Sequence, residues 1–291
     1  MTLSNNTNWV VQSFHKDKTS FVENVEDYEG QEILFLACTQ RGELSSYKQN
    51  KLVESWMAFL PTIDLKEIHF LTRVPQKLFD AACQVNSLEG LYVKWSGDGI
   101  KNYEQARNLT NLKRLYLGDS TQISDVSPLA DLTNLEWLQL IGQKQVKNLS
   151  PISNLKKLEG LSISGSRFGV QKIESLSPLR KLENLRVLYL TNLHSMDLDL
   201  SPLLSLKNLE FLDVANRYPT EEYARLAAQL PKNCDHGFSG VRDRGFKCDK
   251  CNDTTLVEIM DKRKRYLCKV CDSDKVAIAE ERFKELRAKY L

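Results

Sequence analysis

Leucine and other apolar residues recur at fixed offsets along most of the chain. The pattern L-x-x-L-x-L, with other apolar residues sometimes replacing leucine, starts at Leu65, Leu88, Leu112, Leu135, Leu158, Leu185 and Leu209. These starts are 23, 24, 23, 23, 27 and 24 residues apart. Within each copy the last two apolar positions are two residues apart, which is the period of a short β-strand. A fixed period of this length indicates a solenoid, because one unit cannot bury its leucines but stacked units can.

Four repeats carry Ser-Pro followed by Leu or Ile after the strand pattern. These copies begin at Ser127, Ser150, Ser177 and Ser201. Serine is a favoured N-cap residue, and proline suits the first helical position because its missing N–H has no helical partner there. We therefore expect the serine to cap a short helical turn on the convex side of each coil. Each repeat would then consist of a strand, a turn, a short helix and a return.

The residues before the regular repeats predict irregular first coils. Residues 32–39 (EILFLACT) have the composition of a further strand. Residues 48–60 and the segment that starts at Pro75 carry apolar residues at helical spacing. We expect an N-terminal cap with irregular first repeats over residues 1–64, regular repeats over 65–233, and a small module with a tail helix over 234–291. The predicted fold class is an α/β solenoid, a horseshoe of parallel strands with short helices or 3-10 turns, plus a small C-terminal domain.

The repeats resemble leucine-rich repeats, specifically the bacterial type found in internalins. Residues 123–140 (ISDVSPLADLTNLEWLQL) are closely similar to the internalin repeat phrase, and the resemblance covers about residues 65–233. The family's asparagine, three residues past the last strand leucine, is replaced by Ser120, Gln143 and Ser166, so a weaker buried amide ladder is expected. The first thirty residues lack the apolar stretch of a secretory signal and no wall anchor is apparent, so an internalin's adhesion to host cells is not carried over.

In this fold the odd positions of each strand point to the concave surface. There they place large aromatic side chains among basic ones, and one further aromatic residue follows the second strand pattern. The candidate partner-binding residues are Tyr92, Trp95, Arg114, Tyr116, Trp137, Tyr189 and Phe211. Exposed aromatic residues mixed with arginine are typical of the centres of protein interfaces. An alternative is that the N-terminal segment or the C-terminal module fills part of this concavity.

Four of the seven cysteines form two Cys-x-x-Cys pairs, Cys248 with Cys251 and Cys268 with Cys271. Four thiolates at this spacing suit tetrahedral zinc and predict a closed structural site without an open coordination position. Residues 246–274 thereby resemble a zinc ribbon or a treble clef. The module has few large apolar residues, so we expect metal binding to supply its folding energy. Cys234 and His236 are interpreted as loop residues rather than as further ligands.

The turn between the two cysteine pairs carries four consecutive basic residues, Lys262, Arg263, Lys264 and Arg265. Beside a zinc ribbon, such a turn can contact a phosphate backbone. It therefore gives an alternative function, that of a nucleic-acid-associated protein, although a solvated charged turn is also compatible with these residues. Beyond the second pair, Val276, Ala279, Phe283, Leu286 and Tyr290 lie at helical spacing. They predict an amphipathic tail helix that docks on the zinc module or on the last repeat.

Charge and motif content narrow the function classes. The chain has 40 basic and 38 acidic residues, so it has no overall preference for polyanions. No apolar run reaches the about 18 residues of a membrane span, and no P-loop, GxSxG, HExxH or dinucleotide-binding fingerprint occurs. Paired cysteines without an export signal favour metal over disulfides and a cytoplasmic location. We therefore expect a non-enzymatic, cytoplasmic protein-binding scaffold with structural zinc and no membrane contact.

Overall fold

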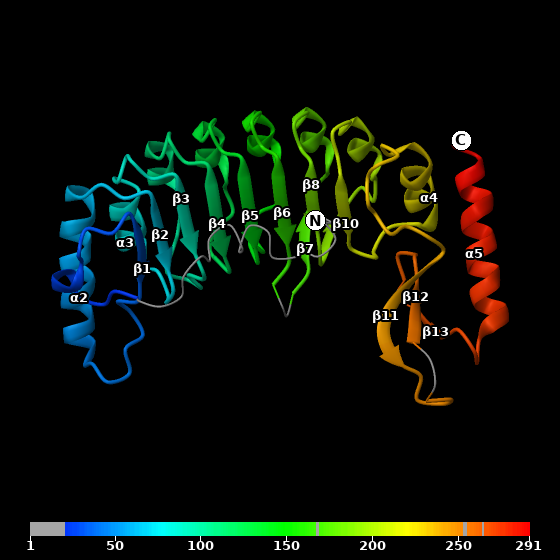
Figure 1. Cartoon of the computed structure of the whole chain (residues 1–291), viewed down its shortest axis with the longest axis horizontal. Helices are drawn as coiled ribbons and strands as arrows, with labels where there is room; N and C mark the ends of the chain where they lie inside the picture. The colour runs from blue at the N-terminus through cyan, green and yellow to red at the C-terminus, as the bar shows by residue number, and fades with distance from the viewer. Residues whose placement is uncertain (1–20, 167–168, 253–254, 264) are drawn as a thin grey trace.

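An eight-stranded parallel sheet runs through the solenoid in the computed structural model, which describes residues 21–166, 169–252, 255–263 and 265–291. The strand order is β1-β2-β3-β4-β5-β6-β8-β10. The strands are β1 (Ile33–Leu36), β2 (Glu67–Phe70), β3 (Gly90–Val93), β4 (Arg114–Gly118), β5 (Trp137–Ile141), β6 (Gly160–Ser164), β8 (Val187–Leu190) and β10 (Phe211–Val214). Figure 1 shows them side by side along a curved solenoid, so the predicted fold class is confirmed. β1, expected within residues 32–39, adds a coil ahead of the regular repeats.

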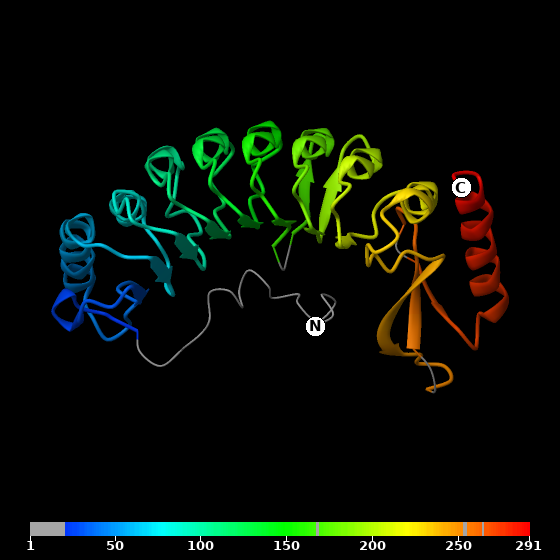
Figure 2. The same ribbon diagram turned by 45° about the horizontal axis from the view of Figure 1, so that its top comes forward.

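Short 3-10 helices form the convex side of the regular coils (Figure 2). They are η4 (Glu104–Asn108), η5 (Ser127–Asp131), η6 (Ser150–Asn154), η7 (Ser177–Lys181) and η8 (Ser201–Ser205). The prediction that serine caps these helices is wrong, because Ser127 is already the first helical residue and Val126 is the N-cap. The residue two places before the serine takes the capping role. Asp125 accepts the Ser127 N–H at 2.8 Å and the Ser127 hydroxyl at 2.7 Å.

The other three Ser-Pro helices are capped in the same way. The side chains of Asn148, Ser175 and Asp199 accept the N–H groups of Ser150, Ser177 and Ser201 at 2.8, 3.0 and 2.8 Å. The residue after each serine is proline, which has no N–H to satisfy. The serine N–H is therefore the donor that most needs a partner at the start of each helix, and an Asx-type or Ser-type turn provides one.

The first coils carry longer helices, as the sequence predicts. They are α2 (Ser46–Phe59) and α3 (Gln76–Ala82), accompanied by the short helices η2 (Val25–Asp27) and η3 (Leu60–Thr62). Trp56 of α2 is fully buried, and its indole N–H donates to the Glu23 carbonyl at 2.7 Å. This contact ties the chain ahead of β1 to the first coil.

The repeat leucines form one continuous core. Leu115, Leu138 and Leu161, on successive strands, are each no more than 1% exposed. The expected weakness of the amide ladder is offset by other buried hydrogen bonds. Ser96 donates to Ser120 at 2.8 Å, and Gln143 donates from its amide to the Leu117 carbonyl at 3.2 Å. Ser120 and Gln143, two of the three residues that replace the family's asparagine, thus still link neighbouring coils.

The longest repeat spacing, from Leu158 to Leu185, makes room for a small extra sheet. Its strands β7 (Gln171–Ile173) and β9 (Leu193–Ser195) pair in parallel. Gln171 is 1% exposed and donates to the Val146 carbonyl at 2.7 Å, so the insertion is bonded to the preceding coil.

The C-terminal residues cover the end of the solenoid. The elements are α4 (Thr220–Gln229), β11 (Val241–Lys247), β12 (Thr255–Ile259), β13 (Tyr266–Cys268) and α5 (Ser273–Ala288). The three strands form an antiparallel sheet in the order β11-β12-β13, which Figure 1 shows next to α4, with α5 at the end of the molecule. Phe238, Met260 and Phe283 belong to the same apolar cluster as the repeat leucines. The module therefore extends the solenoid core instead of building a separate one.

The tail helix α5 contacts both the small sheet and the last coils. Val276 packs with Val241 and Val257 of the sheet, while Tyr290 donates its hydroxyl hydrogen to Glu221 of α4 at 2.6 Å. Gly240 allows this approach, because a Cβ there would lie 2.6 Å from the Ala279 carbonyl oxygen. Among the helices of the described residues, none is long and apolar enough to span a membrane.

Candidate interaction surface and candidate metal centre

Figure 2 shows the strands along the inner, concave side of the solenoid. Two rows of side chains cross this sheet on the face opposite the leucine core. One row consists of Ile33, Glu67, Gly90, Arg114, Trp137, Gly160, Val187 and Phe211. The other consists of Phe35, His69, Tyr92, Tyr116, Gln139, Ser162, Tyr189 and Asp213. Each residue lies opposite its counterpart on the next strand, so side chains of neighbouring coils meet directly.

Four rings of the second row stack on one another from β1 to β4. The ring centroids are 4.5 Å apart for Phe35 and His69, 5.7 Å for His69 and Tyr92, and 4.4 Å for Tyr92 and Tyr116. These separations are near the spacing of about 4.8 Å between paired strands, so the sheet itself sets the stack. Such pairs contribute about 0.5–1.5 kcal/mol each beyond area burial. The sheet thus holds the four rings in contact with one another.

Trp137 extends the ring stack from the other row. Like Tyr116, it packs against Tyr92, and its indole lies over the backbone of Gly160 on β6. A Cβ on Gly160 would be 2.0 Å from the Trp137 Cε3 atom, which is a severe overlap. The glycine on β6 thus creates the space in which the indole lies.

The aromatic surface has a break, which the sequence analysis did not anticipate. Tyr189 and Phe211 form a second pair with centroids 4.9 Å apart, on β8 and β10. Between this pair and Trp137 lies β6, which contributes only Gly160 and Ser162 to the two rows. The expected stripe is therefore two aromatic clusters on either side of a strand with small side chains.

The structure shows the surroundings of two further candidate residues, Trp95 and Arg114. Trp95 lies in the loop after β3, with its ring 3.8 Å from the position that a Cβ on Gly97 would take, and so stands beyond the two rows. Arg114 is in the first row but forms an ion pair with Glu67 two strands away. Sequence reasoning missed Phe35, although aligning ILFL of residues 33–36 with EIHF of residues 67–70 would have placed it opposite His69.

Glu67 is a buried carboxylate at the N-terminal end of the concave surface, and it contacts two neighbouring side chains. It is 7% exposed, accepts a hydrogen bond from His69 at 3.0 Å and pairs with Arg114. Burial opposes ionisation of this carboxyl, but the His69 hydrogen bond and the Arg114 charge outweigh it and lower the pKa of Glu67. Burial raises the pKa of Tyr92 and Tyr116, so both phenols remain protonated at neutral pH. Glu67 and Arg114 thus neutralise each other, and the neighbouring rings of Tyr92 and Tyr116 carry no charge.

The second aromatic cluster borders the C-terminal module. Asp213, next to Tyr189 on the second row, pairs with Arg242 of β11 at 3.3 Å. Burial raises the pKa of Asp213 against the pull of Arg242 and Arg244. Burial, with help from the Asp213 charge, raises the pKa of Tyr189 to about 12. The Asp213–Arg242 ion pair therefore connects the last strand of the concave surface to the C-terminal module.

The four predicted metal ligands come from two separate segments of the C-terminal module, but they lie close together in space. Cys248 and Cys251 follow β11, Cys268 ends β13 and Cys271 precedes α5. Their four sulfur atoms all lie within 4.8 Å of one another, with 3.6 Å between those of Cys251 and Cys268. Four thiolates around zinc, with Zn–S bonds of about 2.3 Å, stand about 3.8 Å apart, so this arrangement could hold a metal ion.

Backbone geometry around the cysteines supports a negative sulfur cluster. The N–H groups of Lys250, Val270 and Cys271 point at the Cys248 and Cys268 sulfurs at 3.4 Å. Hydrogen bonds from the Cys271 thiol to the neighbouring cysteine sulfurs raise the pKa of Cys271 to about 12, so a nearby cation is what would allow all four to ionise. Cys234 and His236 lie outside this cluster, since Cys234 packs in the solenoid core and His236 accepts the Phe238 N–H at 2.9 Å.

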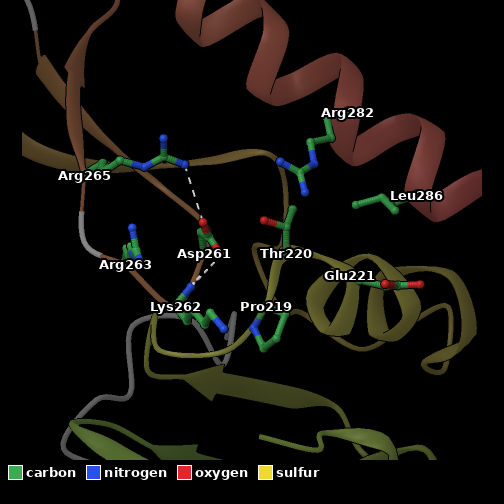
Figure 3. A pocket seen from close by; sticks show the side chains of 9 residues that line it. All are labelled: Pro219, Thr220, Glu221, Asp261, Lys262, Arg263, Arg265, Arg282 and Leu286. Carbon is green, nitrogen blue, oxygen red and sulfur yellow. Dashed lines mark hydrogen bonds and ion pairs between the residues drawn. The ribbon is translucent and has the colours of Figure 1, made fainter.

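The basic turn after β12 lies next to a further basic residue, which comes from α5. Lys262, Arg263 and Arg265 line a hollow together with Arg282 of α5, and Lys264 is outside the described residues (Figure 3). Arg265 pairs with Asp261 at 3.4 Å. Sequence reasoning missed Arg282, because nothing in the spacing shows that α5 folds back against the turn.

Comparisons with known proteins give fold likenesses only. No protein-family model matches the sequence, and no curated protein matches it. The chain is similar to an internalin, InlF from Listeria monocytogenes, with 22% identity and a TM-score of 0.40 over 60% of this chain and 48% of that chain. It is also similar to a leucine-rich-repeat protein from Leptospira interrogans, with 18% identity and a TM-score of 0.33 over 70% and 58% of the two chains. For the functional domain of InlJ from Listeria monocytogenes the values are 17%, 0.36, 60% and 34%.

The chain spans less than two thirds of each of these three structures. The assignment of a leucine-rich-repeat solenoid rests on the strand order and the buried leucines of this chain, not on those likenesses.

Proposed function

We propose that the protein is a non-enzymatic scaffold that binds another protein on its concave surface. The observation that carries this proposal is the ring stack from Phe35 to Tyr116, continued by Trp137 over Gly160. Tyr116, Trp137, Tyr189 and Phe211 are each half-buried, so their outer edges remain available to a partner. Aromatic side chains already held in place lose little conformational freedom on binding, which favours affinity.

The break at β6 suggests how a partner would lie. Trp137, whose indole covers Gly160, lies on one side and Tyr189 with Phe211 on the other, which leaves a low strip at Ser162. A partner with one ridge of side chains seated on that strip would contact both aromatic clusters at once. Arg114, already paired with Glu67, would contribute orientation more than binding energy.

We propose further that the four cysteines hold a structural zinc ion in a zinc-ribbon-like or treble-clef-like module. Support comes from the sulfur spacing, from the backbone N–H groups aimed at sulfur and from the helix that follows the second pair. With four thiolate ligands the coordination shell would be full, so no water would be activated there. A zinc–thiolate site and reduced cysteines fit the cytoplasmic location that the sequence predicts.

The test of the concave proposal is affinity capture with Tyr116→Ala combined with Trp137→Ala. The wild-type chain should capture a protein from native lysate after nuclease treatment, and the double variant should capture at least about tenfold less, because central aromatic residues dominate interface energies. Tyr47→Ala is a matched control, since Tyr47 is a 71% exposed tyrosine on α2, away from the concave surface. Undiminished capture by a folded double variant, or capture that disappears with nuclease, would contradict the proposal.

A further inference from the structure

Two adjoining hollows lie between α5 and the rest of the C-terminal module. The first, of about 460 Å³, is lined by the start of α4, the turn before β13 and α5 (Figure 3). The second, of about 270 Å³, lies between β12, β13 and α5. Thr220, Arg265 and Arg282 line both hollows, so the two form one continuous depression, named the α5 groove below.

One half of the α5 groove carries an excess of positive charge. Lys262, Arg263 and Arg282 have no ion-pair partner within the described residues, while Arg265 is paired with Asp261. The remaining acid of this hollow, Glu221, accepts the Tyr290 hydroxyl at 2.6 Å. Four cations thus line this hollow with two acidic groups, which leaves it with a net positive charge that favours an anionic ligand.

The start of α4 borders the same hollow. The helix begins at Thr220, and no side chain caps it, but Glu221 and Glu222 in its first turn offset its positive end. Figure 3 shows Arg282 reaching from α5 toward Thr220, whereas the cations of the turn lie on the other side of Asp261.

The other half of the α5 groove is mainly apolar. Ile259, Leu267, Ile278 and Ala279 line it, together with Lys275, which pairs with Asp272 at 2.9 Å. Ile278 is 68% exposed, which is unusual for a large aliphatic side chain beside a hollow. A ligand that fills both halves must combine anionic groups with an apolar group a short distance away.

The lining distinguishes between two kinds of polymer. Single-stranded nucleic acid is held by aromatic side chains on which its bases stack, yet no aromatic ring is among the described residues that line either hollow. Aliphatic side chains instead match an aliphatic or aromatic side chain of a peptide. We propose that the α5 groove binds an acidic peptide segment, with its carboxylate or phosphoryl groups at Arg263 and Arg282 and an apolar side chain against Ile278.

This inference extends the proposed scaffold function. It rests on that function in one respect, namely that the bound peptide would be part of a protein partner. The α5 groove would be a second contact, separate from the aromatic rows of the concave surface. A peptide bound there does not need those rows, which allows the two proposals to fail independently.

The experiment is selection of short random peptides displayed on phage against the full, zinc-loaded chain. We expect enriched peptides to combine several acidic residues with one apolar residue, and one such peptide is then measured by fluorescence anisotropy. Arg263→Gln with Arg282→Gln should weaken its binding by at least about tenfold, and Ile278→Ser by about fivefold. Lys284→Gln should leave binding unchanged, because Lys284 is an exposed α5 cation that lines neither hollow.

Several outcomes would overturn the inference. These are a selection without enrichment, enriched peptides that lack acidic residues, and binding that is insensitive to the arginine variant. Binding of an oligothymidine probe that the same arginine variant removes would assign the groove to nucleic acid instead. The Tyr116→Ala, Trp137→Ala chain should bind the selected peptide as tightly as the wild type, so failure of the concave proposal leaves this result unaffected.

Discussion

At the scale of single residues, Gly160 decides the shape of the concave surface. It lies opposite Trp137 in the strand register, and the indole occupies the space above its backbone. In Gly160→Ala the new methyl group would lie 2.0 Å from Trp137 Cε3, so the indole must rotate away. We expect a loss of about 1–3 kcal/mol in the free energy of unfolding, as in overpacked cores, together with a changed near-ultraviolet circular dichroism signal.

Gly42→Ala is the control for this substitution. Gly42 has open space around the position of a Cβ, so the same chemical change there should be neutral or slightly stabilising. Equal stabilities for the two variants would show that the indole does not depend on the glycine. Trp137→Ala combined with Gly160→Ala should lose less than the sum of the two single changes, because the overlap is then absent.

At the scale of elements, the convex helices depend on the residue two places before serine. Asp125 accepts both the N–H and the hydroxyl of Ser127, and these hydrogen bonds lower the pKa of its carboxyl. We expect Asp125→Ala to lower the free energy of unfolding by about 1 kcal/mol, the usual worth of a lost cap, as measured by urea denaturation. Ser127→Ala should cost less, since its N–H keeps its acceptor. If Ser127→Ala proved the more costly, serine would be the cap after all.

The repeats also show which elements can be predicted from sequence. Strand positions follow from leucine spacing, because burial on one face of a parallel sheet requires apolar residues at every second position. The cap could not be predicted from propensity, since serine is a good N-cap in general, and only the following proline makes its N–H the donor to satisfy. The extra strands β7 and β9 carry too few residues for a periodic signal.

The site was predictable to a similar degree. Strand register alone places Tyr92, Tyr116 and Tyr189 in one row and Trp137 in the neighbouring one. The break at β6 was not predicted, because the small residues of that strand give no hydrophobic or aromatic signal in the sequence. The four cysteines could be grouped from their spacing, whereas Arg282 required knowledge of how α5 packs. Contacts between distant segments depend on tertiary packing, which local sequence does not encode.

At the scale of the whole molecule, the C-terminal module and the solenoid share one core. Met260 and Phe283 of the module pack into the cluster of repeat leucines. Asn216, after the last solenoid strand and 4% exposed, donates to the Ile259 carbonyl at 2.7 Å and accepts the Asp261 N–H at 3.0 Å. Loss of order in the module would therefore uncover the apolar end of the last coil.

This coupling predicts the consequence of removing the metal. If zinc holds the four cysteines, treatment with a chelator should lower the free energy of unfolding of the whole chain by more than about 3 kcal/mol, since structural zinc supplies folding energy. We expect a single thermal transition at lower temperature and faster amide hydrogen exchange in β10. Cys268→Ser should behave like the chelated wild type, and a chelator should change it no further. Unaltered exchange in β10 would instead show that the solenoid is stable alone, and that the shared core contributes little to holding the last coil.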